Sequence, residues 1–258
     1  MHYQTIRLTV ADDIATLTLN RPDVMNALNT QMRAEILDAV RFIEREARVL
    51  VITGEGRAFC SGQDLGDRAT AAQLDLERVL RDEYEPMLKA IFSCPIPTIS
   101  AVNGSAAGAG ANLALAADVV IATESAMFLQ AFARIGLIPD AGGTYWLPRQ
   151  MGFARAMGAA LFAEPVTARQ ASDWGMIWEA VPDTEFVEHW QARARHLAQG
   201  PTVAYGAIKE ALRASYANTL EDQLTLEARL QGAAGKTRDF KEGVVAFTEK
   251  RHARFEGR

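Results

Sequence analysis

The sequence predicts an α/β fold assembled from repeated units of two strands and a helix. Short apolar runs that suit strands alternate with longer segments in which apolar residues recur at helical spacing. A run of small residues separates one of the strands from the helix that follows it. Hydrophobic residues make up 49% of the 258 positions. That is enough to fill the core of one large domain, with or without a helical appendage.

The clearest elements lie near the start of the chain. Residues Thr5 to Val10 and Ile14 to Leu19 alternate apolar and polar side chains across a short turn. This pattern predicts a β-hairpin with one buried face. Residues Asn26 to Arg45 show helical spacing of apolar side chains. The apolar run Leu50 to Thr53 predicts a buried strand, and a polar loop follows it.

The same alternation returns further along the chain. Residues Thr70 to Phe92 have helical periodicity, and two prolines end that segment. A strand over Thr98 to Val102, a helix over Ala111 to Ala117 and a strand over Asp118 to Thr123 are expected next. From Ala154 onward the sequence is mostly helical, with prolines between its segments.

Charge and composition exclude several functions. The net charge is −5, so no general attraction to nucleic acid or to an anionic membrane is expected. The helix expected over 30–46 mixes three arginines with four acidic residues, which does not favour RNA binding. No apolar span approaches transmembrane length and no basic leader precedes one, so a cytoplasmic protein is expected.

Cysteine and histidine are placed outside the small-residue motifs. Cys60 and Cys94 are far apart and belong to no metal-spaced cluster, so they are interpreted as small buried hydrophobic residues. The four histidines also lie elsewhere in the sequence. Neither a bound metal nor a histidine-based triad is therefore expected.

Two motifs carry the chemical prediction. The small residues from Asn103 to Asn112 open a helix, where free backbone N–H groups favour an oxyanion. The segment Leu137 to Gly143 places one carboxylate, Asp140, between a proline and a glycine pair. Oxyanion donors beside a single carboxylate base favour proton transfer next to a carbonyl. Asp140 could equally be a turn residue or a helix N-cap.

These motifs together resemble those of the crotonase (enoyl-CoA hydratase/isomerase) superfamily. The matching segments are spread over much of the chain: Leu19–Pro22 with Asn26–Asn29, Gly56–Asp64, Ala101–Gly104, Ala107–Gly110 and Gly136–Thr144. Within that superfamily, the amino-acid sequence around Asp140 and that of the C-terminal segment Arg238–Arg251 resemble the sequences of ring-1,2-epoxyphenylacetyl-CoA isomerases.

The resemblance implies a crotonase-like core of ββα repeats over residues 1–195. It also implies a C-terminal helical region over residues 196–258 that packs in a homotrimer or a dimer of trimers. The substrate would be an acyl-CoA thioester, with no cofactor beyond the coenzyme A that the substrate carries. The backbone N–H groups of Gln63 and Ala109 would hold the thioester oxygen.

Two positions depart from the hydratase pattern. Where enoyl-CoA hydratases carry their two catalytic glutamates, this chain has Asn112 and Phe132. Neither side chain can take a proton from water at neutral pH, so hydration by two carboxylates is not expected. Asp140 would then be the acid/base of an isomerase. Asn112 is either a cap, a hydrogen-bonded turn residue or a polar contact to the substrate.

The remaining substrate contacts follow from the resemblance. The loop with Arg57, Ala58, Ser61, Asp64 and Leu65 would thread the coenzyme A, largely through its backbone. Asp64 could instead cap a helix or fix the loop.

Other positions complete the expected site. Gly108 and Gly110 belong to the small-residue turn. Phe132 could line an aromatic acyl pocket, as could the neighbours Tyr145 and Trp146, or all three could be core residues. Lys250, with Arg251, would contact the phosphates or simply end a solvated helix.

Alternative functions remain open from the sequence. The first is a general Δ3,Δ2-enoyl-CoA isomerase that uses the same aspartate. The second is an enoyl-CoA hydratase-like protein. The third is a catalytically silent member that binds acyl-CoA.

Overall fold

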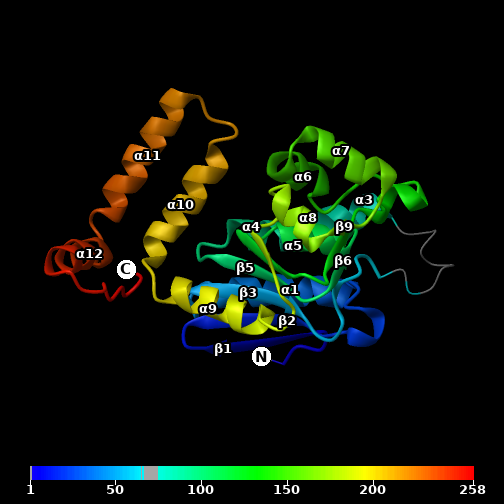
Figure 1. Cartoon of the computed structure of the whole chain (residues 1–258), viewed down its shortest axis with the longest axis horizontal. Coiled ribbons are helices and arrows are strands. Elements are labelled where there is room, and N and C mark those ends of the chain that lie inside the picture. The colour runs from blue at the N-terminus through cyan, green and yellow to red at the C-terminus, as the bar shows by residue number, and fades with distance from the viewer. Residues whose placement is uncertain (1, 65, 67–74) are drawn as a thin grey trace.

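The computed structural model describes residues 2–64, 66 and 75–258, and it has the predicted α/β architecture (Figure 1). The strands are β1 (Ile6–Ala11), β2 (Ile14–Leu19), β3 (Val49–Gly54), β4 (Ala58–Cys60), β5 (Thr98–Val102), β6 (Ser105–Ala107), β7 (Val119–Thr123), β8 (Met127–Leu129), β9 (Val166–Thr167) and β10 (Glu179–Val181).

The helices alternate with these strands and then replace them. The α-helices are α1 (Thr30–Ile43), α3 (Leu76–Val79), α4 (Glu85–Ser93), α5 (Ala109–Leu115), α6 (Gly143–Met151), α7 (Phe153–Phe162), α8 (Ala168–Asp173), α9 (Phe186–Ala198), α10 (Thr202–Ala214), α11 (Leu220–Ala234) and α12 (Arg238–Glu249). A π-helical turn, η2 (Leu80–Tyr84), joins α3 to α4, and the 3-10 turns are η1 (Pro22–Val24) and η3 (Ala131–Ile135).

Two sheets organise the core. The larger has the strand order β1-β2-β3-β5-β7-β10, and only its β1–β2 hairpin is antiparallel. The smaller has the order β4-β6-β8-β9, with β9 antiparallel to β8. Consecutive strands β3 and β4, then β5 and β6, then β7 and β8, alternate between the two sheets. Each repeat therefore contributes one strand to each sheet, as ββα units require.

The larger sheet is buried on both faces at its central strand β3, whereas its edge strand β1 is largely exposed. Along β3, Leu50 and Ile52 belong to the main apolar cluster with α1, α4 and α5, whereas Val49 and Val51 belong to the cluster formed with α9. This period of two follows from the pleat of a strand, which turns successive side chains to opposite faces. All four side chains are fully buried.

Several predicted boundaries need correction. The helix predicted from Asn26 begins at Thr30, because the Asn29 side chain accepts a hydrogen bond from the Met32 N–H and caps it. Asn26 itself lies in a left-handed turn with φ 56°. Of the helix predicted over 70–92, the first five positions lie outside the described residues and Asp75 is the N-cap of α3. The remainder is helical through α3, the π-helical turn and α4. The predicted hairpin and the strand over Thr98–Val102 are confirmed.

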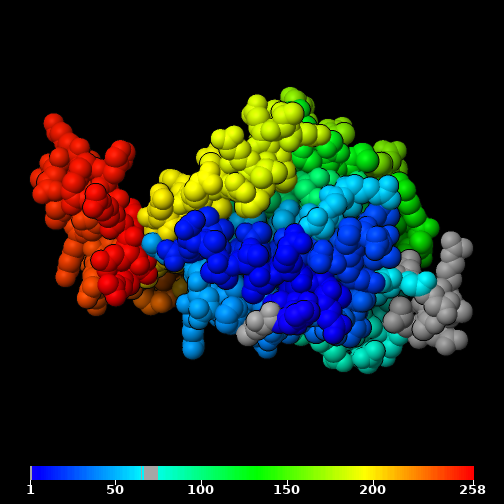
Figure 2. Space-filling view, turned by 90° about the horizontal axis from the view of Figure 1, so that it is seen from below, coloured from blue at the N-terminus to red at the C-terminus, as the bar shows by residue number. Residues whose placement is uncertain are grey.

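The C-terminal helices form a projecting lobe. Figure 2 shows α11 and α12 at one end of the molecule, beyond the body that the sheets form. Helix α10 is joined to that body by Lys209 and Arg213, whose side chains pair with Asp118 at 2.7 and 2.6 Å. The predicted boundary after residue 195 falls within α9, so the division into two units stays a prediction. Among the described residues, no helix is both long and apolar enough to cross a membrane.

Candidate active site

A cavity of about 290 Å³ brings together the segments that the sequence singled out. It is lined by Ser61, Gly62 and Gln63 after β4, by Gly108 and Ala109 at the start of α5, and by Asp140 before α6. Its apolar wall comes largely from α3 and η2 on one side and from η3 on the other; the wall residues include Leu76, Val79, Leu80, Phe132 and Ile135.

The two backbone turns of the cavity lie against each other. A Cβ added to Gly62, whose φ is +95°, would lie 2.8 Å from the Ala107 carbonyl oxygen and 3.4 Å from the Ala109 nitrogen. A Cβ on Gly110 would lie 2.3 Å from the Cys60 carbonyl oxygen. Glycine at both positions therefore permits the end of β4 and the start of α5 to approach closely.

The Gln63 and Ala109 N–H groups remain available to a ligand. The Leu28 N–H donates to the Gly62 carbonyl at 2.8 Å, and the Asp64 N–H donates to the Leu28 carbonyl at 3.1 Å. These bonds fix the backbone on both sides of Gln63 but leave its own N–H free among the described residues. The Ala109 N–H is the first of a helix and has no intrahelical acceptor.

The Gln63 side chain is held by a buried charge network that the sequence did not reveal. Arg33 is 2% exposed and pairs with Glu83 at 2.6 Å. Its Nη1 donates to the Leu28 carbonyl at 2.6 Å and to Gln63 Oε1 at 3.0 Å. The Tyr84 hydroxyl donates to the same Gln63 oxygen at 2.7 Å, and its ring centroid lies 4.7 Å from the Arg33 guanidinium carbon. These contacts connect α1 and η2 to the turn from Ser61 to Asp64, which we call the oxyanion turn.

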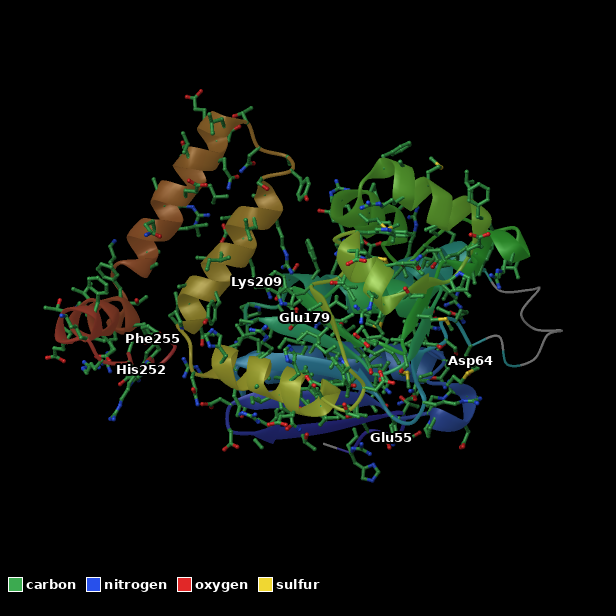
Figure 3. All side chains as sticks on the ribbon, viewed as in Figure 1. Glu55, Asp64, Glu179, Lys209, His252 and Phe255 are labelled. Atoms are coloured by element: carbon green, nitrogen blue, oxygen red, sulfur yellow. The ribbon has the colours of Figure 1, made fainter. Side chains whose placement is uncertain are left out.

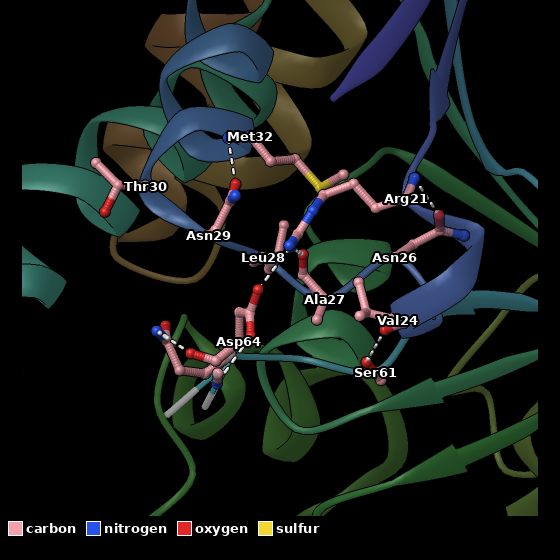
Figure 4. A network of polar contacts seen from close by, with 12 residues as sticks. Arg21, Val24, Asn26, Ala27, Leu28, Asn29, Thr30, Met32, Ser61 and Asp64 are labelled. Carbon is pink, nitrogen blue, oxygen red and sulfur yellow. Dashed lines mark hydrogen bonds and ion pairs between the residues drawn. The ribbon is translucent and has the colours of Figure 1, made fainter. Parts of the chain in front are cut away.

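A second ion pair holds the other side of that turn (Figure 4). Arg21 donates from Nη1 to Asp64 Oδ2 at 2.7 Å and also bonds the Ala27 carbonyl. The other Asp64 oxygen accepts the Gly66 N–H at 2.9 Å. The Arg21 guanidinium and the Gly66 N–H hold the pKa of Asp64 below its usual range, against the effect of burial. Asp64 is thus engaged within the loop, which favours its loop-fixing interpretation over substrate contact.

Asp140 stands at the opposite wall, with a carboxyl group that the protein does not use for capping. Helix α6 has Gly142 as its N-cap and no side-chain cap bond, so the N-cap interpretation of Asp140 is wrong. Its Oδ1 is buried and has no hydrogen-bond partner among the described residues. Burial raises the pKa of the Asp140 carboxyl to about 6. A carboxylate with that pKa can exchange protons near neutral pH.

Asn112 does not reach the cavity, which corrects its expected role as a substrate contact. Its side chain is fully buried, donates from Nδ2 to the Asp140 carbonyl at 2.7 Å, and accepts from Gln130 Nε2 at 2.9 Å. Gly110 is likewise buried, close to Cys60 of β4, and is not among the residues that line this cavity. Sequence reasoning missed Gln130, because nothing in a single sequence links positions 18 residues apart through a hydrogen bond.

Of the other residues predicted to contact the substrate, some line the cavity and others do not. Phe132 lines the cavity and is 6% exposed, and Ser61 lines it with its hydroxyl bonded to the Val24 carbonyl at 3.2 Å. Arg57 and Ala58 lie before the turn and outside the lining. Leu65 lies outside the described residues.

Lys250 is not brought to the cavity within this chain. It ends α12, and Figure 3 shows Asp64 far from the neighbouring residues His252 and Phe255 at the other end of the molecule. The adjacent Arg251 is already paired with Glu242 at 2.6 Å and with Glu249 at 2.6 Å. A role for Lys250 toward a neighbouring copy stays a prediction.

A larger cavity of about 690 Å³ adjoins Asp140 on its other side. It extends between α4 and α6 and shares five lining residues with the smaller one: Leu76, Leu80, Tyr84, Leu137 and Asp140. Trp146 and Phe92 line it, with ring centroids 5.1 Å apart. Tyr145 packs edge-on against Trp146 but lies outside the lining. The two cavities together form a largely apolar space, and Asp140 lines both.

The fold and site define a class of protein: paired sheets of ββα repeats whose turns present two free N–H groups and one carboxylate to a single cavity. Comparison with known proteins identifies the family. The enoyl-CoA hydratase/isomerase family matches residues 9–258, and this chain belongs to it.

Individual relatives carry two different names. A Rhodobacter capsulatus protein named "Probable enoyl-CoA hydratase" is 62% identical over the whole of both chains. The 1,2-epoxyphenylacetyl-CoA isomerase of Escherichia coli is 47% identical over 96% of this chain and 97% of that protein. The crystal structure of an enoyl-CoA hydratase from Bacillus anthracis superposes with a TM-score of 0.91 at 31% identity, covering 99% of this chain and 100% of that one.

Proposed function

We propose that this protein is an isomerase of acyl-CoA thioesters in which Asp140 moves a proton while the Gln63 and Ala109 N–H groups hold the thioester oxygen. One observation carries the proposal. A half-buried carboxyl with a raised pKa and an unpartnered oxygen faces the cavity in which those two N–H groups are free. The proposal needs no metal and no cofactor beyond the coenzyme A of the substrate.

The chemistry follows from this arrangement. Two N–H donors stabilise negative charge on the thioester oxygen, which acidifies the adjacent C–H. Asp140 removes that proton, the electron pair enters the conjugated enolate, and the same carboxyl returns the proton to the vinylogous carbon. The double bond moves between the Δ3 and Δ2 positions, and no atom is gained or lost. Water is not needed at any step.

As the first-choice substrate we propose ring-1,2-epoxyphenylacetyl-CoA, which would open to the oxepin-CoA. The support is the 47% identity to the isomerase from Escherichia coli and the aromatic lining of the larger cavity by Phe92 and Trp146. A general Δ3,Δ2-enoyl-CoA isomerase would use the same Asp140 and is distinguished only by the acyl group it accepts.

Hydration is the second candidate, favoured by the name of the 62% identical relative. It would require a second acid/base group to activate water. Asn112 is sealed in the core, and Phe132 places a ring where hydratases carry a carboxylate. Asp140 is the one carboxylate among the described residues that line the smaller cavity. This lining supports isomerisation over hydration.

The test compares wild type with Asp140→Asn on a 3-enoyl-CoA, on ring-epoxidised phenylacetyl-CoA and on a 2-enoyl-CoA in water. We expect the wild type to isomerise at least one of the first two, and the variant to lose about a hundredfold or more in kcat. Asp82→Asn is the matched control, because Asp82 is exposed on η2 and lines neither cavity.

Two results would contradict the proposal. The first is full activity of Asp140→Asn. The second is water addition without isomerisation, which would establish the hydratase. Thioester binding with no turnover of any of the three substrates would instead support a silent acyl-CoA-binding protein.

We also propose that the C-terminal helices pack against other copies in a trimer or a dimer of trimers. Their apolar side chains support this, since Leu212, Leu220 and Phe247 are 66%, 75% and 87% exposed in the single chain. In that assembly Lys250 would be free to meet the phosphates of a neighbour's ligand. Sedimentation equilibrium tests the assembly, and a monomer at micromolar concentration would contradict it.

A further inference from the structure

The turn that carries Asp140 is conformationally demanding. Ala141 has φ +47° and Gly142 has φ +84°, so two consecutive residues adopt the left-handed conformation directly after the carboxylate. A non-glycine residue in that region costs about 1 kcal/mol or more, and such strain persists only where the surroundings enforce it. The contacts that enforce it here determine where Asp140 points.

The Asp140 carbonyl receives two hydrogen bonds. One comes from the Gly143 N–H at 2.8 Å, within the turn itself. The other comes from Asn112 Nδ2 at 2.7 Å and connects the turn to α5, a segment 28 residues earlier in the chain. Asn112 is thus a link from outside the turn to the residue that bears the carboxyl group.

The Asn112 side chain occupies space that is available because residue 143 is glycine. A Cβ on Gly143 would lie 2.4 Å from Asn112 Nδ2 and 2.9 Å from its Cγ. The side chain is 0% exposed, so no water competes for the bond. Any larger residue at 143 would push the amide away from the Asp140 carbonyl.

The orientation of the Asn112 amide is set by a second amide. A carbonyl oxygen can only accept, so Asn112 must present its NH2 group to Asp140 and its Oδ1 to the opposite side. There Gln130, which is 3% exposed and precedes η3, donates from Nε2 to Oδ1 at 2.9 Å. The hydrogen bonds therefore run in one direction, from Gln130 to Asn112 to Asp140.

We propose that Asn112 and Gln130 are positioning residues that hold the strained Asp140 turn so that its carboxyl faces the thioester. This inference rests on the proposed role of Asp140 but adds two residues that touch neither the cavity nor the reacting atoms. The position at which hydratases carry a catalytic glutamate is thus used in this chain to anchor the backbone of another acid.

The test uses two variants of different severity. Asn112→Ala removes the link to the turn. Gln130→Met keeps a side chain of similar length and leaves Asn112 in place, but removes the donor that orients it. Thr98→Val is the matched control for loss of a buried hydrogen bond, because Thr98 is fully buried and bonds Asp118 at 2.9 Å.

The first readout does not depend on any substrate. Protein labelled with 13C at aspartate carboxyls is titrated by NMR, with Asp140→Asn identifying the Asp140 signal. A loosened turn admits water, so the Asp140 midpoint should fall by about one pH unit in Asn112→Ala and by less in Gln130→Met. The other titratable or charged groups around Asp140 are common to all variants: Tyr84, Arg134, Glu77, Arg81, Glu85 and Lys89.

The second readout is kinetic. On the substrate that the wild type isomerises, kcat should fall about tenfold or more in Asn112→Ala with KM within about threefold. The acid limb of the pH profile should shift together with the NMR midpoint. Thr98→Val should lower the melting temperature without moving either readout.

The outcomes separate the two proposals. If the Asp140 midpoint shifts in the variants but the wild type isomerises none of the substrates, the positioning role stands and the proposed function is overturned. Wild-type midpoint and kcat in Gln130→Met and Asn112→Ala would overturn the positioning role and leave the function standing. If Asn112→Ala fails to fold, the comparison of Gln130→Met with Thr98→Val decides.

Discussion

The turn that carries Gln63 and the turn that carries Asp140 meet at one cavity, yet opposite kinds of contact hold them. Around Gln63 the contacts are charged, since Arg33 pairs with Glu83 and Arg21 pairs with Asp64. Around Asp140 they are neutral amides. For its proposed role the oxyanion turn needs only rigidity, because the groups proposed to hold the thioester oxygen are backbone N–H groups, which do not titrate.

The turn that carries Asp140 must be held in place without a change in the pKa of its carboxyl. A cation paired with Asp140 would lower the pKa of its carboxyl, and a carboxylate neighbour would raise it further. Neutral amides hold the turn without either effect, so burial raises the pKa of the Asp140 carboxyl to about 6 against the lowering effect of a hydrogen bond from its own backbone. One turn is thus fixed by ion pairs and the other by neutral amides, and the neutral contacts belong to the turn for which proton transfer is proposed.

The largest effect on stability is expected from disrupting the ion pair between Arg33 and Glu83 beside the Gln63 turn. In Arg33→Met, Glu83, whose side chain is only 15% exposed, would lose its partner at 2.6 Å and keep Arg78 at 3.9 Å. Gln63 Oε1 would lose one of its two donors. Removing one partner of a buried ion pair costs about 3 kcal/mol of unfolding free energy, and the more distant Arg78 offsets part of that loss. Urea unfolding measures it, and kcat should fall with it.

The double variant Arg33→Met with Glu83→Gln is the control for Arg33→Met. It removes the Glu83 charge that Arg33 no longer balances, so it should recover part of the stability but not the loss of kcat. Full recovery of both would mean that the network serves stability alone.

The pH profile of activity distinguishes the turn that carries Gln63 from the turn that carries Asp140 without any mutation. Because Asp140 must be ionised to act as a base, kcat/KM should fall about tenfold per pH unit below about 6. The pKa values of Glu83 and Asp64 are lowered by their arginine partners, so the oxyanion turn stays intact through this range. The stability from those lowered carboxyls is lost only as the pH falls below their ordinary values.

Unfolding free energy measured between pH 7 and pH 5 should therefore not decrease while activity does. A parallel decline of both would show that the acid limb reports unfolding and not protonation of Asp140.

A smaller effect is expected on the stability of Asp140→Asn. The folded pKa is raised above the unfolded value of about 3.8, so the folded state holds the proton more tightly. The associated stability is present below about pH 4 and is lost as the pH rises through about 6. Asparagine removes that loss, so the variant should be more stable by about 1 kcal/mol at pH 7 after allowing for solvent screening.

The difference between Asp140→Asn and wild type should shrink as the pH approaches 4. Thermal unfolding at pH 4 and pH 7 checks it. A variant that is less stable than wild type at pH 7 would mean that the carboxylate has a partner in the folded state.

The smallest effect is expected for Asp64→Asn. Its ion pair with Arg21 is about one-fifth exposed, so its loss should cost about 1 kcal/mol or less. The amide can still bond the Gly66 N–H, and kcat should change less than threefold. A loss as large as that of Asp140→Asn would show that Asp64 contacts the substrate after all.

The sequence predicted the fold where its periodicity was long enough to read. The hairpin of β1 and β2 and the strand β5 were predicted with bounds within a residue of those observed. The strands of the smaller sheet were not, because β4, β6 and β8 have three residues each and β9 has two. An alternation cannot be recognised in runs so short.

The same limit applies to the site. Glycine and the Pro-Asp turn mark their own local geometry, so the two turns could be placed from the sequence. Burial of both cysteines was also predicted and is confirmed, and burial raises the pKa of the Cys60 thiol to about 12. The roles of Arg33, Asn112 and Gln130 depend on partners far along the chain, which no local pattern encodes.

The direction of the hydrogen bonds from Gln130 to Asn112 has an evolutionary consequence. Asn112 Oδ1 is paired with Gln130 Nε2, and replacing either residue leaves the other atom buried and unpaired at a cost of about 1–3 kcal/mol. Single replacements at positions 112 and 130 should therefore be disfavoured, and paired replacements tolerated. Across the descendants of this gene, the two positions should change together and Gly143 should change rarely.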